Sequence, residues 1–346
     1  MARVAVVLYN LGGPDSLDAV QPFLFNLFSD PLIMRQPGLI RWMLARLISS
    51  RRAPVAKEIY AQIGGRSPIL EETRKQADAL SEALGGEDTY GVFVAMRYWK
   101  PFAQDCAADV KAYEPDRIIL LPLYPQFSTT TTQSFLKIWN EAVKDIGLDR
   151  PTASLCCYPA EAGFIDAVAE LTRSEIEAAG DLTSVRILFS AHGLPRKFVA
   201  AGDPYQAQVE MTVAAVLQKL ALSDLDYAIC YQSRVGLVEW LRPYTDDEIK
   251  RAGADGKKVI VVPVAFVSEH SETLVELDIE YEKLARDYKV PSYRRVSTVG
   301  THPAFVAALA RLVDMAHFNG IQSGTGERQC PVACGACAMR DPHKAA

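Results

Sequence analysis

The amino-acid sequence predicts an α/β protein made of two similar doubly wound, Rossmann-like domains with parallel strands. Three observations lead to this fold class. Short apolar runs alternate with segments of helical periodicity, which is typical of parallel sheets covered by helices on both faces. The order of these runs in the first half of the chain recurs in the second half. The chain has 346 residues, which is enough for two hydrophobic cores.

Six apolar runs have the length and composition of buried strands. They cover residues 4–9, 90–95, 118–123, 185–189, 227–230 and 259–264. Segments with helical periodicity lie between them, for example 69–84 and 206–220. This alternation predicts strand–helix–strand units, which join parallel strands in an α/β sheet.

The two halves share three echoes, each made of a strand followed by a polar turn. The run 4–14 is echoed by 185–195, the run 93–98 by 229–234, and the run 118–128 by 259–268. We therefore expect one domain over 1–180, a second over 181–320 and a short tail over 321–346. Ligands of open α/β sheets bind at the carboxyl ends of the strands, so the turns are expected to face one interdomain cleft.

The charge and hydropathy of the chain exclude some classes of protein. It has 37 Lys and Arg against 42 Asp and Glu, a formal net charge of −5, which argues against nucleic acid as a partner. No apolar run reaches 18 residues, so no transmembrane helix is expected. The first apolar run ends at Asn10 and is too short for a signal peptide, which favours a cytoplasmic protein.

Residues 19–57 form an unusual segment that is strongly apolar and basic. Its only acidic residue is Asp30. Such a segment suits a lip that closes over an apolar anion, or a surface that docks on an anionic membrane. The simpler interpretation is a pair of amphipathic helices that pack on the core with a solvated basic face. We call residues 19–57 the lip.

His192 follows a predicted strand, within a turn formed by Gly193 and Pro195. An imidazole at the carboxyl end of a strand is well placed to act as a general base near neutral pH. The alternative is a structural histidine that binds the backbone of its own loop.

Three glutamates follow the last predicted strand at a spacing of four residues: Glu272, Glu276 and Glu280. On a helix beginning at Ser271 they form one acidic stripe, which is unfavourable unless a cation or shared protons compensate. With the imidazole of His270 beside it, the stripe suits a divalent metal in transit or a proton path. The alternative is a solvated helix face.

Three of the seven cysteines lie close together near the C-terminus: Cys330, Cys334 and Cys337. The spacing resembles that of radical enzymes that cleave S-adenosylmethionine, but only nine residues follow Cys337, which excludes that class. A zinc site needs a fourth ligand, and an iron–sulfur cluster needs a fourth cysteine. The adjacent Cys156 and Cys157 can supply it. Unligated tail cysteines are the remaining alternative.

Seven ordered motifs together resemble a known family. They lie at 10–14, 63–68, 96–98, 123–128, 190–195, 232–236 and 268–281. Over Val4 to Cys337 the chain resembles the ferrochelatases, which insert Fe²⁺ into a porphyrin and release two protons in the last step of haem biosynthesis. The motif at 10–14 resembles the branch that uses protoporphyrin IX.

The resemblance implies roles for individual residues. His192 would take pyrrole protons or meet the iron, Glu272 would be its acidic partner and fellow iron ligand, and Glu276 and Glu280 would extend an acidic relay. Other residues would bind the porphyrin, its propionates or the opposite face of the ring: Leu11, Arg52, Ser67, Arg97, Tyr98, Tyr124, Gln232 and Phe266. Protoporphyrin IX and Fe²⁺ would be the partners, and the sequence leaves open a homodimer and peripheral contact with the inner face of a membrane.

The cysteine pattern departs from that of the animal ferrochelatases. Thr129 stands where those enzymes have a cluster cysteine. The tail instead resembles bacterial members that carry a structural or regulatory 2Fe–2S cluster and take the fourth thiolate from elsewhere. Cys156 is favoured over Cys157 because the apolar face of the strand would hold Ala153, Leu155 and Cys157. Two rival functions are a porphyrin carrier without turnover and a cobalt chelatase acting on a ring with more carboxylates.

Overall fold

The structure is a computed structural model, and it describes residues 1–236, 238–318 and 320–339. Internal contacts divide the chain into two units. The first unit is Met1–Cys157 together with Leu309–Arg328, and the second is Tyr158–Ala308 together with the chain from Gln329.

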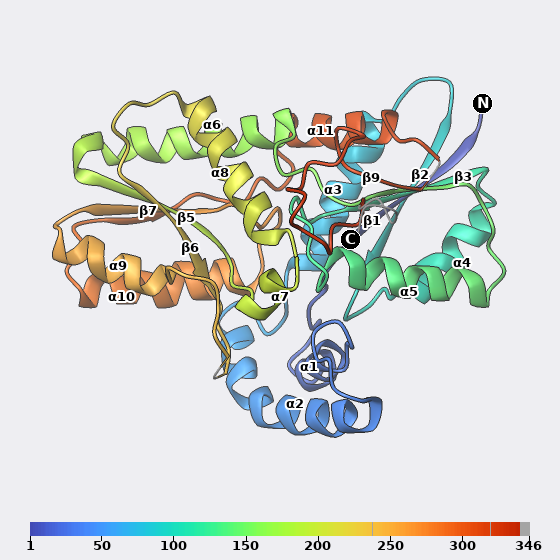
Figure 1. The fold of residues 1–346 in the computed structure, drawn as a ribbon, viewed down its shortest axis with the longest axis horizontal. Coiled ribbons are helices and arrows are strands. Elements are labelled where there is room, and N and C mark those ends of the chain that lie inside the picture. Colours follow the sequence, from blue (N-terminus) through green and yellow to red (C-terminus); the bar gives the residue numbers. More distant parts are fainter. Residues whose placement is uncertain (237, 319, 340–346) are drawn as a thin grey trace. The chain divides into compact units, whose positions relative to one another are not determined.

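The described part of the first unit contains a parallel sheet in the order β2-β1-β3-β4-β9 (Figure 1). Its strands are β1 (Arg3–Asn10), β2 (Thr89–Met96), β3 (Arg117–Pro122), β4 (Thr152–Leu155) and β9 (Gly320–Gln322). All residues of β1 after Arg3 are buried, because β1 is central and covered on both faces. This burial on both faces explains why the strand could be predicted from a continuous apolar run.

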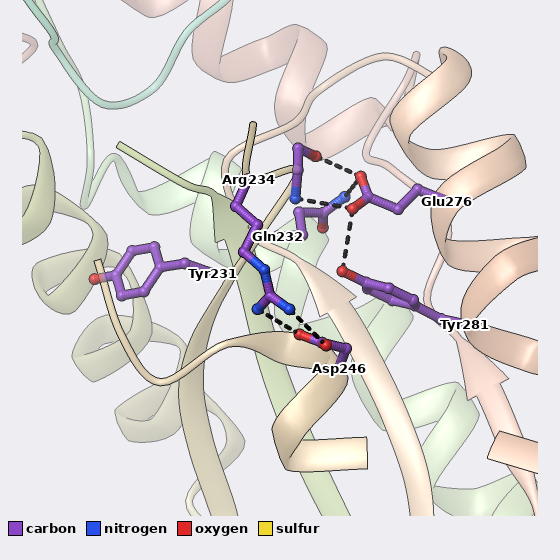
Figure 2. Close-up of a pocket in the computed structure, with 7 residues that line it drawn as sticks. Tyr231, Gln232, Arg234, Asp246, Glu276 and Tyr281 are labelled. Carbon is purple, nitrogen blue, oxygen red and sulfur yellow. Dashed lines mark hydrogen bonds and ion pairs between the residues drawn. The ribbon is translucent and has the colours of Figure 1, made fainter. Parts of the chain in front are cut away.

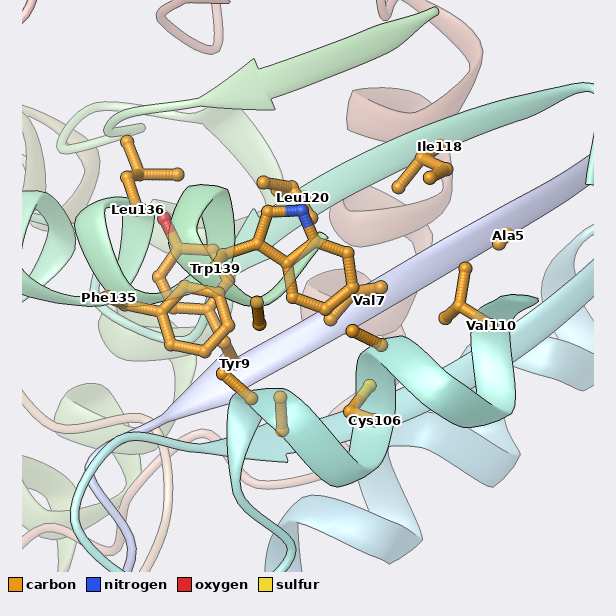
Figure 3. Close-up of a cluster of buried hydrophobic side chains, with 14 of the residues drawn as sticks. Ala5, Val7, Tyr9, Cys106, Val110, Ile118, Leu120, Phe135, Leu136 and Trp139 are labelled. Carbon is orange, nitrogen blue, oxygen red and sulfur yellow. The ribbon is translucent and has the colours of Figure 1, made fainter. Parts of the chain in front are cut away.

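Helices cover both faces of this sheet: α3 (Ile69–Ala83), α4 (Ala103–Tyr113) and α5 (Thr132–Asp145). Aromatic rings fill the space between β1 and α5 (Figure 3). Tyr9 stacks on Phe135 with ring centroids 4.0 Å apart, and Phe135 stacks on Trp139 at 6.2 Å. Packing of this kind holds the carboxyl end of β1 rigidly in place.

The lip contains two helices, α1 (Val20–Phe28) and α2 (Gly38–Ala61). Helix α1 buries Val20, Phe23 and Leu24 against Tyr60 and Tyr98. Helix α2 buries mainly small residues and leaves several large apolar side chains exposed: Leu39, Ile40, Trp42, Met43, Leu47 and Val55. The lip therefore combines a packed apolar face with an exposed one.

The described part of the second unit contains a parallel sheet in the order β6-β5-β7-β8. Its strands are β5 (Val185–His192), β6 (Tyr227–Gln232), β7 (Lys258–Pro263) and β8 (Tyr293–Arg295). Its helical segments are α6 (Ala162–Ala179), η1 (Leu182–Ser184), α7 (Arg196–Ala200), α8 (Tyr205–Leu220), α9 (Thr245–Ala254), η2 (Glu272–Tyr281) and α10 (Glu282–Asp287). Helix α11 (Pro303–Asp314) runs across the boundary at Leu309.

The predicted pair of doubly wound parallel-sheet domains is confirmed. The four strands of the second sheet follow the same order as the first four strands of the first sheet, which adds β9 at its edge. The structural boundary lies at Cys157, earlier than the expected 180, because α6 packs on α8 within the second unit. Strands β8 and β9 were not anticipated, since each has only three residues. The helix expected after Ser271 is present, but η2 is a π-helix.

Candidate active site

Neighbouring strands of the second unit carry the central side chains of the site. His192 ends β5, and it pairs in register with Gln232, which ends β6. Strand β5 lies between β6 and β7, and η2 follows β7 along the chain. The parallel arrangement therefore brings an imidazole, an amide and a carboxylate-bearing helix to one edge of the sheet.

Gly193 allows the ends of β5 and β6 to lie in direct contact. The backbone N–H of Gly193 donates to the carbonyl of Gln232 at 2.8 Å. A Cβ at position 193 would lie 2.8 Å from that carbonyl oxygen and 3.0 Å from the Trp240 ring. Any larger residue would push the two strand ends apart. Tyr205 also anchors the turn, because its hydroxyl donates to the His192 carbonyl at 3.0 Å.

His192 and Glu272 form the central pair of the site. The distance from His192 Nδ1 to Glu272 Oε2 is 2.8 Å. The side chains are 41% and 27% exposed, so the pair is open to a ligand. Burial lowers the pKa of His192, but the charge and hydrogen bond of Glu272 outweigh it and leave this pKa above its usual value. Burial raises the pKa of Glu272, but His192 and His270 bring it far below its usual range.

His270 is a site residue that we noted beside the acidic run but did not include among the candidates. Its Nε2 lies 3.7 Å from Glu272 Oε2, and its Nδ1 lies 3.0 Å from the Ser268 carbonyl oxygen. Because a carbonyl only accepts hydrogen bonds, Nδ1 carries a proton and Nε2 faces the carboxylate. Phe266, predicted to line the ring pocket, packs on the His270 ring at 4.6 Å between centroids. The only sequence signal for His270 was its position just before the glutamates.

Glu276 lies in a cradle of hydrogen-bond donors (Figure 2). It accepts from Gln232 Nε2 at 3.0 Å, from the Ser233 backbone N–H at 2.8 Å, from the Ser233 hydroxyl and from the Tyr281 hydroxyl at 3.1 Å. Ser233 adopts a φ of +63°, which aims both of its donors at the carboxylate. Burial and the charge of Glu272 nevertheless raise the pKa of Glu276. This carboxyl is therefore suited to hold a proton.

Gln232 connects the strand edge to η2. Its amide oxygen accepts from Ser190 Oγ at 2.8 Å, and its Nε2 donates to the Glu272 carbonyl at 3.1 Å as well as to Glu276. The predicted porphyrin-binding role of Gln232 stays a prediction. Glu280, the third glutamate, is exposed.

A cavity of about 200 Å³ adjoins Glu276. Its walls are Tyr231, Gln232, Ser233, Arg234, Asp246, Glu276 and Tyr281. Arg234 and Asp246 form a bidentate ion pair, with distances of 2.9 and 3.0 Å, on one side of it (Figure 2). The cavity therefore offers polar surroundings next to the carboxyl whose pKa is raised.

Arg97 and Tyr98 of the first unit both contact the buried carboxylate of Asp30, which was not among the predicted site residues. Arg97 Nη2 contacts Asp30 Oδ2 at 2.9 Å, and the Tyr98 hydroxyl donates to the same oxygen at 2.7 Å. Ser134 also donates to Asp30 and accepts from Arg97 Nε at 2.6 Å. Asp30 is the lone acidic residue of the lip, so this network ties the lip to β2 and α5.

The other predicted porphyrin-binding residues of the first unit do not belong to the Asp30 network. Leu11 packs with the α1 cluster, and the Arg52 guanidinium lies 5.8 Å from the centre of the Phe28 ring. Burial lowers the pKa of Arg52. Ser67 lies so close to Gly13 that a Cβ there would be 2.5 Å from its side chain. The Tyr124 hydroxyl is buried without a hydrogen-bond partner in the described chain, and burial raises the pKa of Tyr124.

The candidate cluster cysteines lie in buried or half-buried positions. Cys156 and Cys157 follow β4 in the first unit, and their sulfurs are 3.6 Å apart. In the second unit, Cys330 and Cys337 are buried, Cys334 is half-buried, and Gln208 Nε2 contacts Cys330 Sγ at 3.0 Å.

An all-thiol donor set with an amide directed at one sulfur fits an iron–sulfur ligand set in its chemistry. Within residues 1–236, 238–318 and 320–339, however, no three His, Cys, Asp or Glu side chains are grouped closely enough to hold a metal ion. The residue types therefore fit an iron–sulfur cluster, but in the described residues the cysteines are not brought together as a ligand set.

Comparisons with known proteins decide the family. The profile of the Ferrochelatase family matches residues 3–317. The chain belongs to the ferrochelatase family. It is 52% identical to a ferrochelatase of Caulobacter vibrioides over 338 residues, covering 96% of this chain and 95% of that protein. It is 50% identical to a ferrochelatase of Phenylobacterium zucineum over 342 residues, covering 98% of each.

The fold of this ferrochelatase family member is also found in a solved structure of another protein. The structure described as SirB from Bacillus subtilis with Fe³⁺ is similar with a TM-score of 0.52 at 11% identity, covering 91% of this chain and 95% of that one. A likeness at this identity shows the shared fold. The family assignment establishes that the chain is a metal chelatase that inserts Fe²⁺ into a porphyrin for haem synthesis.

Proposed function

We propose that the porphyrin is protoporphyrin IX and that His192, assisted by Glu272, takes the two pyrrole protons. The observation that carries this proposal is the 2.8 Å contact between His192 Nδ1 and Glu272 Oε2 in a partly exposed pair. An ionised carboxylate only accepts hydrogen bonds, so Nδ1 donates to it and Nε2 keeps a lone pair. That lone pair is the base, and Glu272 stabilises the imidazolium that forms.

The protons then leave through the acidic residues of η2. Burial and the charge of Glu272 raise the pKa of Glu276, whereas its hydrogen-bond donors favour the ionised form, so this carboxyl can take up a proton more readily than an exposed glutamate and release it again. Glu280 is exposed and forms the solvent end of the path.

Fe²⁺ is the second substrate, and we propose that His192 and Glu272 meet it. An imidazole nitrogen and carboxylate oxygens are ligands that ferrous iron accepts. His270 Nε2 lies 3.7 Å from the same carboxylate oxygen, Glu272 Oε2. The same two residues therefore serve the iron and the protons, and the iron replaces the proton charge as it enters the ring.

The porphyrin is proposed to contact the residues that the family resemblance indicates: Leu11, Arg52, Ser67, Arg97, Tyr98, Tyr124, Gln232 and Phe266. Two features of the first unit support this. The Tyr124 hydroxyl is buried and unpartnered among the described residues, and Arg52 carries a partly buried positive charge that suits a propionate. A ring held by its edges can be bent, which exposes the pyrrole nitrogens to the base.

The decisive experiment is an anaerobic insertion assay that follows the Soret band of protoporphyrin IX with Fe²⁺. We expect His192→Ala and Glu272→Gln each to lower kcat by about 10²- to 10⁴-fold, the usual contribution of a general base. His302→Ala and Glu282→Gln are matched controls, because neither residue contacts the central pair. Near-normal turnover in both test variants would refute the assignment, and protoporphyrin binding without turnover in the unmodified protein would favour the carrier function.

We also propose that Cys330, Cys334, Cys337 and either Cys156 or Cys157 hold a 2Fe–2S cluster with a structural or regulatory role. Thiolates are the ligands of such clusters, and the Gln208 amide directed at Cys330 is the kind of hydrogen bond that tunes them. When bound, the cluster would supply a redox-active group, and no step of the insertion passes through it.

Single Cys→Ser variants test the cluster ligands. We expect Cys330→Ser, Cys334→Ser, Cys337→Ser and one of Cys156→Ser and Cys157→Ser to lose visible iron–sulfur absorption and bound sulfide. Cys106→Ser and Cys230→Ser are controls, since both cysteines lie in hydrophobic cores. Full sulfide content in all the tail variants would rule out the ligand set.

We further propose that the exposed apolar face of α2 rests on an anionic membrane surface. Arg41, Arg46 and Arg51 lie on the same helix as the exposed Leu39, Trp42 and Met43. A basic helix with a large apolar surface is typical of proteins that lie at the lipid interface. Among the described residues, no helix is long and apolar enough to cross a membrane.

A further inference from the structure

The π-helix η2 is a conformation that needs support. A π-helix closes its hydrogen bonds over five residues, and most occurrences are a single turn inside an α-helix. Here it extends over ten residues, Glu272–Tyr281. Both Glu272 and Glu276 belong to it, so the direction of their carboxylates depends on the wide turns being kept.

Arg295, the last residue of β8, joins two points of this segment. Its Nη1 contacts Glu269 Oε1 at 2.6 Å, before the helix begins. Its Nε and Nη2 contact the two oxygens of Asp278, within the helix, at 2.7 and 2.6 Å. The guanidinium is 12% exposed, and its planar fork matches the carboxylate of Asp278 in the bidentate arrangement.

Neighbours of Arg295 reinforce the same segment. The Tyr293 hydroxyl donates to the backbone carbonyl of Leu277, inside the helix, at 2.7 Å. The backbone N–H of Thr298 donates to Glu269 Oε1 at 2.9 Å, on the oxygen that Arg295 also contacts. Burial raises the pKa of Glu269, but the charge of Arg295 outweighs it and lowers this pKa below its usual value. The carboxylate therefore stays ionised as an anchor.

Arg294 provides a comparison on the same strand. Side chains alternate along a strand, so Arg294 points to the other face, where its Nε pairs with Glu175 of α6 at 2.5 Å. Arg294 makes a single ion-pair contact and is 38% exposed, whereas Arg295 makes three contacts and is 12% exposed, and only Arg295 contacts the π-helical segment. Arg294 is therefore a control for the loss of an arginine from β8 that leaves η2 untouched.

We propose that Arg295 is a positioning residue for the insertion reaction. By bridging Glu269 and Asp278, it holds η2 in its π-helical path, and so keeps Glu272 against His192 and Glu276 within its donor cradle. Tyr293 assists by binding the Leu277 carbonyl. This inference rests on the proposed roles of Glu272 and Glu276, and it adds a residue that touches neither the porphyrin nor the iron.

The test compares Arg295→Met and Arg295→Lys with Arg294→Met in the full-length protein. We expect Arg295→Met to lower kcat by about 10- to 100-fold, because displacements near 1 Å have effects of that size. The KM for Fe²⁺ should rise, while the Kd of protoporphyrin IX, measured by fluorescence quenching, should stay within about twofold. Arg295→Lys should recover little activity because an ammonium lacks the planar fork. Arg294→Met should keep both kcat and the KM for Fe²⁺.

Amide hydrogen exchange gives a readout that does not depend on activity. Residues 272–281 should exchange faster in Arg295→Met than in Arg294→Met, whereas strands β5 and β7 should be equally protected in both. Equal kcat and equal exchange of the two variants, each corrected for its folded fraction, would overturn the inference.

Two further variants keep the test decisive. If Arg295→Met does not fold, Tyr293→Phe removes only the hydroxyl on Leu277, and Tyr288→Phe is its exposed control. The same loss of kcat, smaller in size, is expected for Tyr293→Phe alone, and equal activity of the two would contradict the proposal. An active Arg295→Met beside inactive His192→Ala would refute this inference alone, whereas an active His192→Ala would refute the proposed function.

Discussion

At the residue scale, the proposed mechanism makes the pair of His192 and Glu272 the point where a proton is taken up. Glu272 occupies Nδ1 of the imidazole and leaves Nε2 as the acceptor. Its charge also makes His192 a stronger base than a free histidine, because it favours the protonated ring. One carboxylate therefore sets both the direction and the strength of the base.

Removal of this charge should lower the pKa of His192. In Glu272→Gln the neutral amide no longer stabilises the imidazolium, whereas burial still disfavours it, so His192 should lose its proton at a lower pH than in the unmodified protein. NMR titration of the five histidines measures this directly. Glu170→Gln is the control, since Glu170 faces His302. An unchanged titration of His192 in Glu272→Gln would contradict the electrostatic account.

Gly193→Ala should damage the strand edge. The new Cβ would lie 2.8 Å from the Gln232 carbonyl oxygen, so β5 and β6 must separate and Gln232 must move from Glu272 and Glu276. We expect a loss of about 1–3 kcal/mol in the free energy of unfolding and reduced insertion activity. Denaturant unfolding and the Soret assay measure the two effects. Gly85→Ala, which meets open space, is the control, and equal stability of both variants would contradict the packing argument.

At the element scale, an ion-pair network joins the amino end of β5 to its neighbours. Arg186 binds Asp226 through two contacts of 2.9 and 3.0 Å and binds Asp255 at 2.8 Å. Asp226 precedes β6 and Asp255 follows α9. The hydrogen bond of Arg186 lowers the pKa of Asp226 below its usual value, although burial opposes this. The network therefore fixes three elements at the end of the sheet opposite the site.

Arg186→Met should reduce the stability of the second unit by about 1–3 kcal/mol at pH 7, because it removes a buried guanidinium with two ion-pair partners and leaves Asp226 with only Lys257 Nζ at 3.7 Å. A lowered folded pKa of Asp226 gives stability that is present above the unfolded pKa of about 3.9 and lost as the pH falls through the folded value. The difference between the two proteins should therefore shrink under acid conditions. Urea unfolding at several pH values tests this against Arg196→Met, which removes only an exposed pair. A difference that stays constant down to about pH 2 would count against it.

At the scale of the whole molecule, two units that share a four-strand order differ in the segments added to their sheets. The first unit adds the lip to its sheet, with an exposed apolar face on α2, and the second adds the π-helix and its acidic residues. The repeated fold is therefore a common scaffold, and the functions lie in the segments that differ.

The α2 surface should bind anionic vesicles. We expect the protein to sediment with vesicles of anionic phospholipid, less with zwitterionic ones, and less at high salt, because the basic residues act through screened charges. Replacement of Leu39, Trp42 and Met43 by Ser should weaken binding by at least about tenfold, since each buried apolar side chain contributes about 1.5–3 kcal/mol. Val332→Ser with Tyr288→Ser changes exposed apolar residues outside α2. Equal sedimentation of both variants would exclude the α2 surface.

Local patterns were sufficient for much of this molecule. The continuous apolar runs predicted six of the nine strands that the described chain contains. Four of these, β1, β3, β5 and β7, are interior strands buried on both faces, whereas the edge strands β2 and β6 are buried only toward their carboxyl ends. The turn at His192 and the acidic run at 272–280 were visible because polar residues directly follow such runs. Asp30 and His270 were not predicted as site residues. The partners of Asp30 are distant in the chain, and His270 is a single residue in a loop.

The sequence by itself determined the fold class, the internal repeat and the residues that face the carboxyl edge of the second sheet, because these depend on short-range periodicity. Only the tertiary structure decided that η2 is a π-helix, that Arg295 bridges it, that Asp30 holds Arg97 and Tyr98, and that α6 belongs to the second unit. The physical reason is that these features arise from contacts between residues that are 17 to 68 positions apart, which no local pattern records.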